Sequence, residues 1–197
     1  MNQVKFDQWQ NDIINTKGNI CLCSGRQVGK STIIAKDAGE FAVQNPNVQI
    51  LMIASVERQA YELFQKCLWY IQDNYKKEIQ TKKNKPTLSR LKLKNGSIIR
   101  CLPAGLDGHG IRGYTIDRLY ADEAAFIPEA VWEAITPMLL TTGGDMVLLS
   151  TPHGNSGFFH RAFHDPNFTK FQISSKTVIS IIKSGLFIKI VICNLEI

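Results

Sequence analysis

The sequence predicts an α/β fold with a mainly parallel central sheet flanked by helices. Three apolar runs, at 19–23, 48–54 and 145–150, have the composition of strands that are buried on both faces. Segments with apolar residues at helical spacing separate the first two runs and follow the second. Because the strands and helices are short and alternate, we expect right-handed parallel crossovers. A chain of 197 residues has the length of one domain, or of one domain with a tail.

Composition narrows the class of protein. The apolar fraction of 44% is enough for a substantial core. The five cysteines are an odd number without a paired CxxC spacing, which argues against a disulfide framework and a structural zinc site. The N-terminal residues lack the apolar core of a signal peptide, and no run of about 20 apolar residues offers a membrane span. We therefore expect an intracellular protein without a membrane association.

A glycine-containing loop follows the first predicted strand and precedes the first long helix. Its residues match the phosphate-loop pattern GxxxxGK[ST] except at the first position, where Ser24 replaces glycine. In such a loop, backbone N–H groups and the helix N-terminus surround the phosphates of ATP. The alternative is an ordinary glycine turn. The predicted nucleotide-binding residues here are Ser24, Gly25, Arg26, Gln27, Val28, Gly29, Lys30, Ser31 and Thr32.

Two of these residues have specific expected roles in the chemistry. Lys30 is expected to pair with the β- and γ-phosphates, and the hydroxyl of Ser31 to ligate Mg²⁺.

Two adjacent acids end another short strand, 118–122, about 90 residues after the loop. Because the carboxyl ends of parallel strands face the ligand crevice, Asp122 and Glu123 are expected beside the phosphates. Asp122 is predicted to bind Mg²⁺, usually through water, and Glu123 to orient and deprotonate the attacking water. After the strand at 145–150, Ser150 and Thr151 form a hydroxyl-bearing turn that can sense the γ-phosphate.

An aromatic residue and an amide, Trp9 and Gln10, lie in a predicted helix at 6–15. The ring can pack against an adenine base while the amide bonds to its edge with both a donor and an acceptor. The alternative is a core tryptophan beside a surface glutamine.

A basic segment runs from Lys76 to Arg100, with nine Lys or Arg residues and the single acid Glu78, in a chain of formal charge +6. It contains Asn95-Gly96 between apolar runs, which predicts a β-hairpin. A polyanionic partner and a merely solvated hairpin surface are equally compatible with this charge.

A glycine-rich loop follows at 105–113; it contains too much glycine to pack as a core element, and it carries Arg112.

Taken together, the segments SGRQVGKS, RGYTIDRLYADEAAF and LLSTPHGNSGFF resemble the ATPase domain of the large terminase subunit, the viral genome-packaging motor. The resemblance covers roughly residues 6–175 and depends on the order and spacing of the motifs, together with Arg26 inside the loop. It implies a P-loop NTPase fold of the RecA/ASCE-like type with a β-hairpin insertion. It also implies Mg²⁺-dependent ATP hydrolysis that powers translocation of double-stranded DNA into a procapsid.

The resemblance assigns roles to residues of this sequence. Trp9 and Gln10 resemble the adenine-recognition motif. Ser150, Thr151 and Pro152 resemble the motif that couples hydrolysis to movement. Arg112 resembles the arginine that a neighbouring subunit's site receives in some members, where it stabilises charge on the transferring phosphoryl group. The implied catalytic residues are Glu123, Lys30, Arg26 and Arg112, and the implied metal ligands are Ser31 and Asp122.

The resemblance also implies partners: double-stranded DNA, the portal protein and the small terminase subunit. The chain is then expected to be a monomer in isolation and a homo-oligomeric ring on the procapsid, in the cytoplasm of the host cell. Full-length members carry a nuclease domain, whereas residues 176–197 resemble no part of the family and hold one acid, Glu196. We therefore expect an ATPase domain at 1–175, an atypical tail and no nuclease activity. The alternatives are a helicase-like P-loop ATPase and a truncated remnant that binds nucleotide or DNA without turnover.

Overall fold

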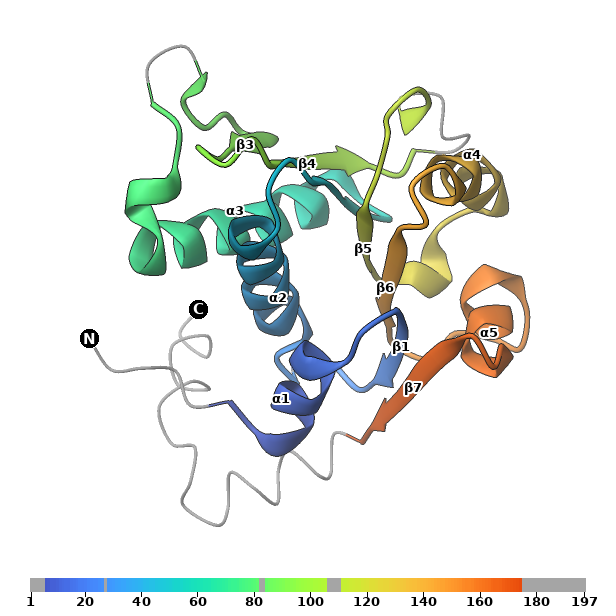
Figure 1. The fold of residues 1–197 in the computed structure, drawn as a ribbon. Helices are drawn as coiled ribbons and strands as arrows, with labels where there is room; N and C mark the ends of the chain where they lie inside the picture. The colour runs from blue at the N-terminus through green and yellow to red at the C-terminus, as the bar shows by residue number, and fades with distance from the viewer. Residues whose placement is uncertain (1–5, 27, 82–83, 106–110, 175–197) are drawn as a thin grey trace.

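The computed structural model describes residues 6–26, 28–81, 84–105 and 111–174, which form a seven-stranded sheet between two layers of helices (Figure 1). The strand order is β3-β4-β2-β5-β6-β1-β7, and every neighbouring pair is parallel except β3 and β4. The strands are β1 (Asn19–Ser24), β2 (Gln49–Ala54), β3 (Arg90–Lys92), β4 (Ile98–Pro103), β5 (Arg118–Asp122), β6 (Asp145–Ser150) and β7 (Phe168–Ile173).

The described helices pack on both faces of the sheet (Figure 1). The α-helices are α1 (Gln8–Asn15), α2 (Lys30–Gln44), α3 (Glu57–Asn74), α4 (Glu129–Leu140) and α5 (Gly157–His164), with short 3-10 turns η1 (Lys76–Glu78) and η4 (Ala124–Phe126). The first helix begins at Gln8, because Asp7 caps it in a capping box with Gln10. None of the described helices has the length and apolar character needed to cross a membrane.

Alternating side chains of the strands divide the interior into two apolar cores. On one face, Ile50 and Met52 of β2 pack with α1, α2 and α3. On the other face, Leu51 and Ile53 of the same strand pack with α4, α5 and the segment between β4 and β5. Burial of both faces explains why these strands are nearly continuous apolar runs in the sequence.

The strand order sets up one functional edge of the sheet. β6 lies between β1, which leads into the glycine loop, and β5, which ends in the acids. The carboxyl ends of these three parallel strands therefore place Ser24, Ser150 and Asp122 along a single edge. The predicted α/β fold with a mainly parallel, helix-flanked sheet is confirmed.

The predicted hairpin is also confirmed, as the antiparallel pair β3 and β4. Its turn needs glycine, because Gly96 has φ +91° and a Cβ there would lie 2.1 Å from Asn47 Oδ1. Asn95 Nδ2 donates to the carbonyls of Ala42 and Val43 at distances of 2.8 and 3.1 Å, and so caps the C-terminal end of α2. Two elements, α5 and β7, were not among the predicted ones.

Candidate nucleotide-binding and catalytic site

The predicted phosphate loop connects the end of β1 to the first residue of α2, Lys30. Gly29 has φ +90°, and a Cβ on it would lie 3.0 Å from Gln10 Nε2. A side chain at this position is therefore disfavoured by the left-handed backbone and crowded by the neighbouring amide. Gly25 N donates to Ile173 O at 3.1 Å, which continues the pairing of β1 with β7 into the loop.

The structure places Gln10 directly against this loop. Gln10 is 8% exposed, so the surface position considered from the sequence is wrong. Its Oε1 accepts a hydrogen bond from Asp7 N at 2.8 Å, which leaves Nε2 on the side of Gly29. Trp9, also on α1, packs against the core, and its Nε1 is buried without a hydrogen-bond partner in the described part of the chain.

Lys30 is a buried cation at the N-terminus of α2, and its side chain is 8% exposed. Its Nζ donates to Gly25 O at 3.1 Å and lies 3.9 Å from Glu123 Oε1. A charge this well shielded from water interacts strongly with any anion that enters the loop.

Ser31 and Asp122 come together across 91 residues of sequence, with Ser31 Oγ donating to Asp122 Oδ2 at 3.3 Å. Burial raises the pKa of the Asp122 carboxyl, and the neighbouring charge of Glu123 raises it further. Both groups offer hard oxygen atoms, the type of ligand that Mg²⁺ prefers, so they fit the predicted metal site. No cluster of three or more His, Cys, Asp or Glu is present among the described residues. A Mg²⁺ held by one or two protein oxygens and phosphate needs none.

The carboxylate of Glu123 is held by the turn that follows β6. Its Oε2 accepts hydrogen bonds from Thr151 N at 3.2 Å, Thr151 Oγ1 at 3.1 Å and Ser150 Oγ at 3.4 Å. These donors and Lys30 approach the same side chain from two neighbouring parts of the sheet edge. The predicted acid, lysine and hydroxyl turn therefore form one connected cluster.

Glu123 has an unusual backbone conformation, with φ +50° and ψ +45°. A non-glycine residue in this left-handed region carries a cost of about 1–3 kcal/mol. Its N–H donates to Asp122 Oδ1 at 3.0 Å, and Ala125 N donates to Ser150 Oγ at 3.2 Å. The strained turn thus points the two adjacent acids in different directions, one toward Ser31 and the other toward Thr151.

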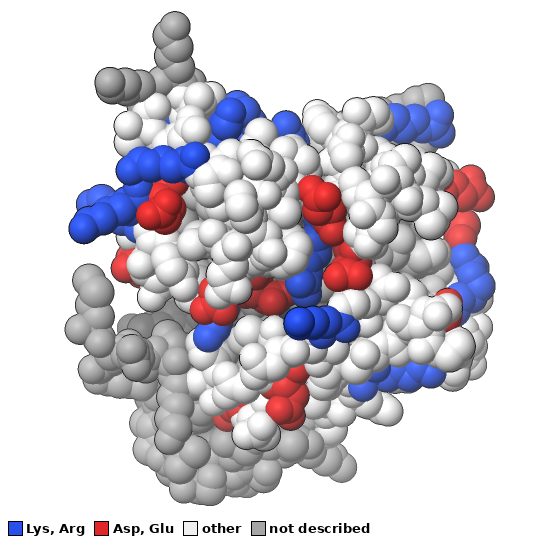
Figure 2. All heavy atoms as spheres, viewed as in Figure 1, with Lys and Arg blue, Asp and Glu red and all other residues white. Residues whose placement is uncertain are grey.

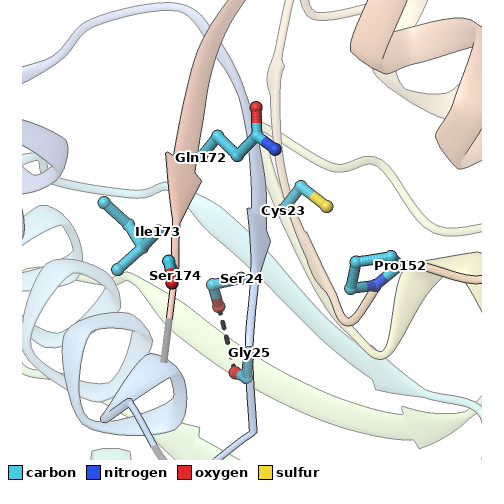
Figure 3. A pocket seen from close by; sticks show the side chains of 7 residues that line it. All are labelled: Cys23, Ser24, Gly25, Pro152, Gln172, Ile173 and Ser174. Carbon is cyan, nitrogen blue, oxygen red and sulfur yellow. Dashed lines mark hydrogen bonds between the residues drawn. The ribbon is translucent and has the colours of Figure 1, made fainter. Parts of the chain in front are cut away.

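A cavity of about 420 Å³ opens beside the loop at the ends of β1 and β7 (Figure 3). The side chain of Gln172 extends from β7 toward Cys23 of β1, and Pro152 lies across from them (Figure 3). The cavity is lined by Cys23, Ser24, Gly25, Pro152, Gln172, Ile173 and Ser174. It lies between the start of the phosphate loop and the turn after Thr151, and the side chains of Lys30, Asp122 and Glu123 do not line it.

The remaining predicted site residues lie outside this cluster. Arg26 and Thr32 are exposed and Val28 is buried, while Gln27 is outside the described residues. Arg112 is exposed in the segment between β4 and β5, and no hydrogen bond or ion pair joins it to a described residue. Residues 106–110 of its glycine-rich loop, and the tail at 176–197, fall outside the described part of the chain.

The basic segment forms part of the surface around η1 and the hairpin. Lys76, Lys77, Lys85 and Lys94 are exposed, and Lys94 N donates to Glu78 O at 2.8 Å. Figure 2, viewed as Figure 1, shows basic side chains gathered at the upper left, over the end of α3 and η1. The guanidinium of Arg100 is already bound within the protein, because its Nη1 donates a hydrogen bond to Gln49 Oε1 at 2.5 Å.

Sequence reasoning missed a second polar cluster, which precedes Asp122 and Glu123 along β5. Asp37, Arg118 and Tyr120 are buried between α2 and β5. A signal was present in the sequence, since Asp37 falls on the helix face that also carries Ile34 and Phe41. A charged residue on an otherwise apolar face indicates a buried partner.

Comparison with models of known protein families shows which family the chain belongs to. The family model described as "Terminase large subunit, T4likevirus-type, N-terminal" matches residues 21–180. The chain belongs to this terminase family. The matched range includes the phosphate loop, the acidic pair Asp122 and Glu123, and the turn at Ser150 and Thr151.

Solved terminase structures share the fold. The Thermus phage P74-26 large terminase ATPase domain superposes with a TM-score of 0.78 and 25% identity, covering 92% of this chain and 86% of that one. The large terminase of a thermophilic bacteriophage, solved in complex with ATP-gamma-S, has a TM-score of 0.70 at 13% identity. That likeness covers 92% of this chain and 48% of the other, and it shows the fold alone. The RecA-like P-loop fold predicted for this chain is therefore confirmed.

A short segment has higher identity to a curated relative. The terminase large subunit of Thermus phage G20c is 46% identical over 50 residues, which are 25% of this chain and 10% of the relative. The match spans a tenth of that protein.

The raised pKa of Asp122 gives a prediction about stability. The folded chain holds this proton more tightly than the unfolded chain, whose Asp pKa is about 3.9. The stabilising contribution is therefore present below that value and is lost as the pH rises through the folded pKa, so the ionised carboxylate opposes folding at pH 7. Asp122→Asn should raise the Tm of the nucleotide-free protein at pH 7, by about 2–4 °C for each kcal/mol relieved.

Thermal melts at pH 7 and pH 5 measure this effect, with the exposed Asp73→Asn as the control. The gain should shrink as the pH is lowered, because the raised pKa means that a growing fraction of the folded wild-type carboxyl is protonated. A Tm that falls at pH 7 would contradict the assignment of Asp122 as a desolvated acid.

Proposed function

We propose that this chain is the ATPase of a DNA-packaging motor, which binds Mg·ATP at the β1–α2 loop and hydrolyses it to ADP and phosphate. The observation that carries this proposal is the Glu123 carboxylate, held by Thr151 and Ser150 and lying 3.9 Å from Lys30 Nζ. A carboxylate fixed in this way next to a buried lysine and a phosphate loop suits the removal of a proton from water at a γ-phosphate.

The roles of the residues follow from their positions. The loop at 24–32 would surround the phosphates with backbone N–H groups, and Lys30 would exchange its contact with Gly25 O for the β- and γ-phosphate oxygens. Ser31 and Asp122 would hold Mg²⁺, which when bound neutralises charge on the β- and γ-phosphates. Glu123 would take the proton of the attacking water as the β–γ bond breaks.

The contact between Glu123 and Thr151 also offers a route from chemistry to movement. Thr151 gives Glu123 both its N–H and its hydroxyl, so a shift of the carboxylate during turnover would pull on the end of β6. The cavity lined by Pro152 and Ser24 provides space for that turn to move. This arrangement supports the role of Ser150 and Thr151 in coupling.

Steady-state phosphate release from Mg·ATP tests this function, with and without double-stranded DNA and with EDTA as the blank. We expect release that depends on Mg²⁺ and increases with DNA. Nucleotide binding without any release, under conditions in which DNA is bound, would instead indicate a remnant without turnover.

Double-stranded DNA is the partner proposed for the basic surface at Lys76, Lys77 and Lys94. Replacing these three exposed lysines with Gln should reduce the slope of log affinity against log salt by about 2.7, at roughly 0.9 for each phosphate contact. Binding titrations between low and moderate salt measure the slope. The control replaces the exposed Lys17, Lys66 and Lys170 with Gln and makes the same charge change elsewhere. Equal slopes for the two variants would contradict DNA contact by these lysines and would indicate a basic surface that is merely solvated.

We also propose that the chain assembles into a ring with the portal protein and the small terminase subunit as partners. In this ring, Arg112 would act in the ATP site of the next subunit. Its exposure, without an ion pair in the described part of its own chain, leaves it accessible to a neighbour. Arginines of this kind contribute about 10³–10⁵ in rate. Mixing inactive Arg112→Ala with inactive Glu123→Gln should restore part of the activity, because some interfaces pair both intact residues. If demonstrably mixed rings show no activity, Arg112 acts within its own chain or is a loop residue, and the role in the neighbouring site is wrong.

A further inference from the structure

A column of contacts joins α2 to β5 on the face of the sheet that carries the phosphate loop. Arg118, Tyr120 and Asp122 alternate along β5, so their side chains leave the strand on the same side. The upper contact of the column is the bond from Ser31 Oγ to Asp122 Oδ2, at 3.3 Å. The contacts below it involve Asp37, which is six positions after Ser31 on α2.

Asp37 meets two residues of β5 at once. Its Oδ2 accepts a hydrogen bond from the Tyr120 hydroxyl at 2.7 Å and lies 3.1 Å from Arg118 Nη2. The Arg118 guanidinium also lies over the ring of Phe41 of α2, with its central carbon 4.8 Å from the ring centroid. Arg118, Tyr120 and Asp122, on one side of β5, thus each contact a residue of α2.

The lower contacts are better suited to fixing position than to adding stability. The Asp37 and Arg118 side chains are 8% and 7% exposed. Burial raises the pKa of Asp37 even though Arg118 and Tyr120 both act to lower it. Arg118 Nε and Nη2 have no hydrogen-bond partner within the described ranges, so the contact with Asp37 is an ion pair without good hydrogen-bond geometry. Buried pairs of this kind add little net stability compared with apolar packing, but they allow few alternative registers.

We propose that Asp37 and Tyr120 are positioning residues, which fix α2 along β5 and thereby hold the Ser31 hydroxyl at bonding distance from Asp122. This inference rests on the proposed function, since Ser31 and Asp122 matter for chemistry only as ligands of Mg²⁺ in the ATP site. The distances make the connection short: Tyr120 is about 7 Å from Asp122 along the strand, and Asp37 is about 9 Å from Ser31 along the helix. A stiff helix transmits a displacement over such a length, and shifts of about 1 Å at a catalytic site are costly.

The test removes one hydroxyl from the column and keeps the core filled. Tyr120→Phe loses the bond to Asp37 and retains the ring. Tyr70→Phe is a matched control, because the Tyr70 hydroxyl donates to Glu40 Oε1 of the same helix at 2.7 Å, but from α3 instead of β5. Binding of a fluorescent ADP analogue is measured over a series of Mg²⁺ concentrations and in EDTA.

Tyr120→Phe should raise the half-saturating Mg²⁺ concentration about three- to tenfold, less than the 10–100-fold typical of a direct partner of a metal ligand. Affinity for the analogue in EDTA should stay unchanged, because the backbone of the phosphate loop is intact. Tyr70→Phe should leave both quantities at the wild-type value. In an Asp122→Asn background, Tyr120→Phe should cause a smaller shift than in the wild-type chain, since one member of the Ser31–Asp122 pair that it aligns is already altered.

The outcomes separate this inference from the function on which it rests. An equal Mg²⁺ shift in the two tyrosine variants, no shift in Tyr120→Phe, or an additive shift in the Asp122→Asn background would each overturn the positioning role alone. Failure of the unaltered chain to bind the analogue at any Mg²⁺ concentration would contradict the ATP site itself, and the positioning role with it.

Discussion

Lys30→Ala should abolish ATP hydrolysis and greatly weaken nucleotide binding. Lys30 is 8% exposed and stands at the N-terminus of α2, where its ammonium would meet the β- and γ-phosphates in surroundings of low dielectric. Removing one preorganised donor from a developing anion costs about 10²–10³ in rate. Loss of a charge-assisted bond to the bound phosphates, about 1.5–3 kcal/mol, weakens binding by roughly 10- to 100-fold in addition.

The chain offers a matched control for this substitution. Lys36 lies on the same helix and forms an ion pair with Glu40 at 3.5 Å, away from the loop. Lys36→Ala should bind and turn over ATP at the wild-type rate. Phosphate release and nucleotide titration measure both variants, and wild-type turnover by Lys30→Ala would remove the phosphate-loop assignment.

Glu123→Gln should keep Mg·ATP bound and stop its cleavage. The amide has the shape of the carboxylate, and its oxygen can still accept the bonds from Thr151 N and Oγ1. Its basicity is lost, however, so the attacking water keeps its proton. General-base catalysis contributes about 10²–10⁴ in rate, and the variant should lose a factor of that size in kcat with little change in nucleotide affinity.

Glu129→Gln is the control for the acid. Glu129 is an exposed carboxylate near the start of α4 that pairs with Arg161, so its loss should leave turnover unchanged. Single-turnover assays distinguish a slow chemical step from slow product release. If Glu123→Gln and Asp122→Asn responded identically at every Mg²⁺ concentration, the division into a base and a metal ligand would lose its support.

The two substitutions with the largest expected effects, Lys30→Ala and Glu123→Gln, both lie at the edge of the sheet where β1, β6 and β5 end. Glu123 reaches Lys30 on one side and Thr151 on the other, so a single carboxylate connects the phosphate loop with the turn after β6. In the proposed cycle, loss of the γ-phosphate removes negative charge from the space beside Lys30 and Glu123. A movement of Thr151 is the direct consequence expected from these contacts.

The sequence by itself determined the local features of the site. The glycine loop could be read because left-handed backbone and close approach require glycine, as Gly29 shows with φ +90° and Gln10 Nε2 against it. The buried strands were evident because burial on both faces demands a continuous apolar run. The hairpin followed from Asn95-Gly96, whose turn geometry is set by a few adjacent residues. The pattern of the edge strand β7 was weaker, since all six of its residues are partly or fully exposed.

Only the tertiary structure decided which side chains meet. The insertion of β6 between β1 and β5 brings Thr151 to Glu123 across 28 residues and Ser31 to Asp122 across 91. The left-handed turn at Glu123 and the pairing of Asp37 with Tyr120 likewise depend on packing between elements. The physical reason is that propensity and periodicity act over a few residues, whereas strand order and helix register are settled by the burial of whole faces.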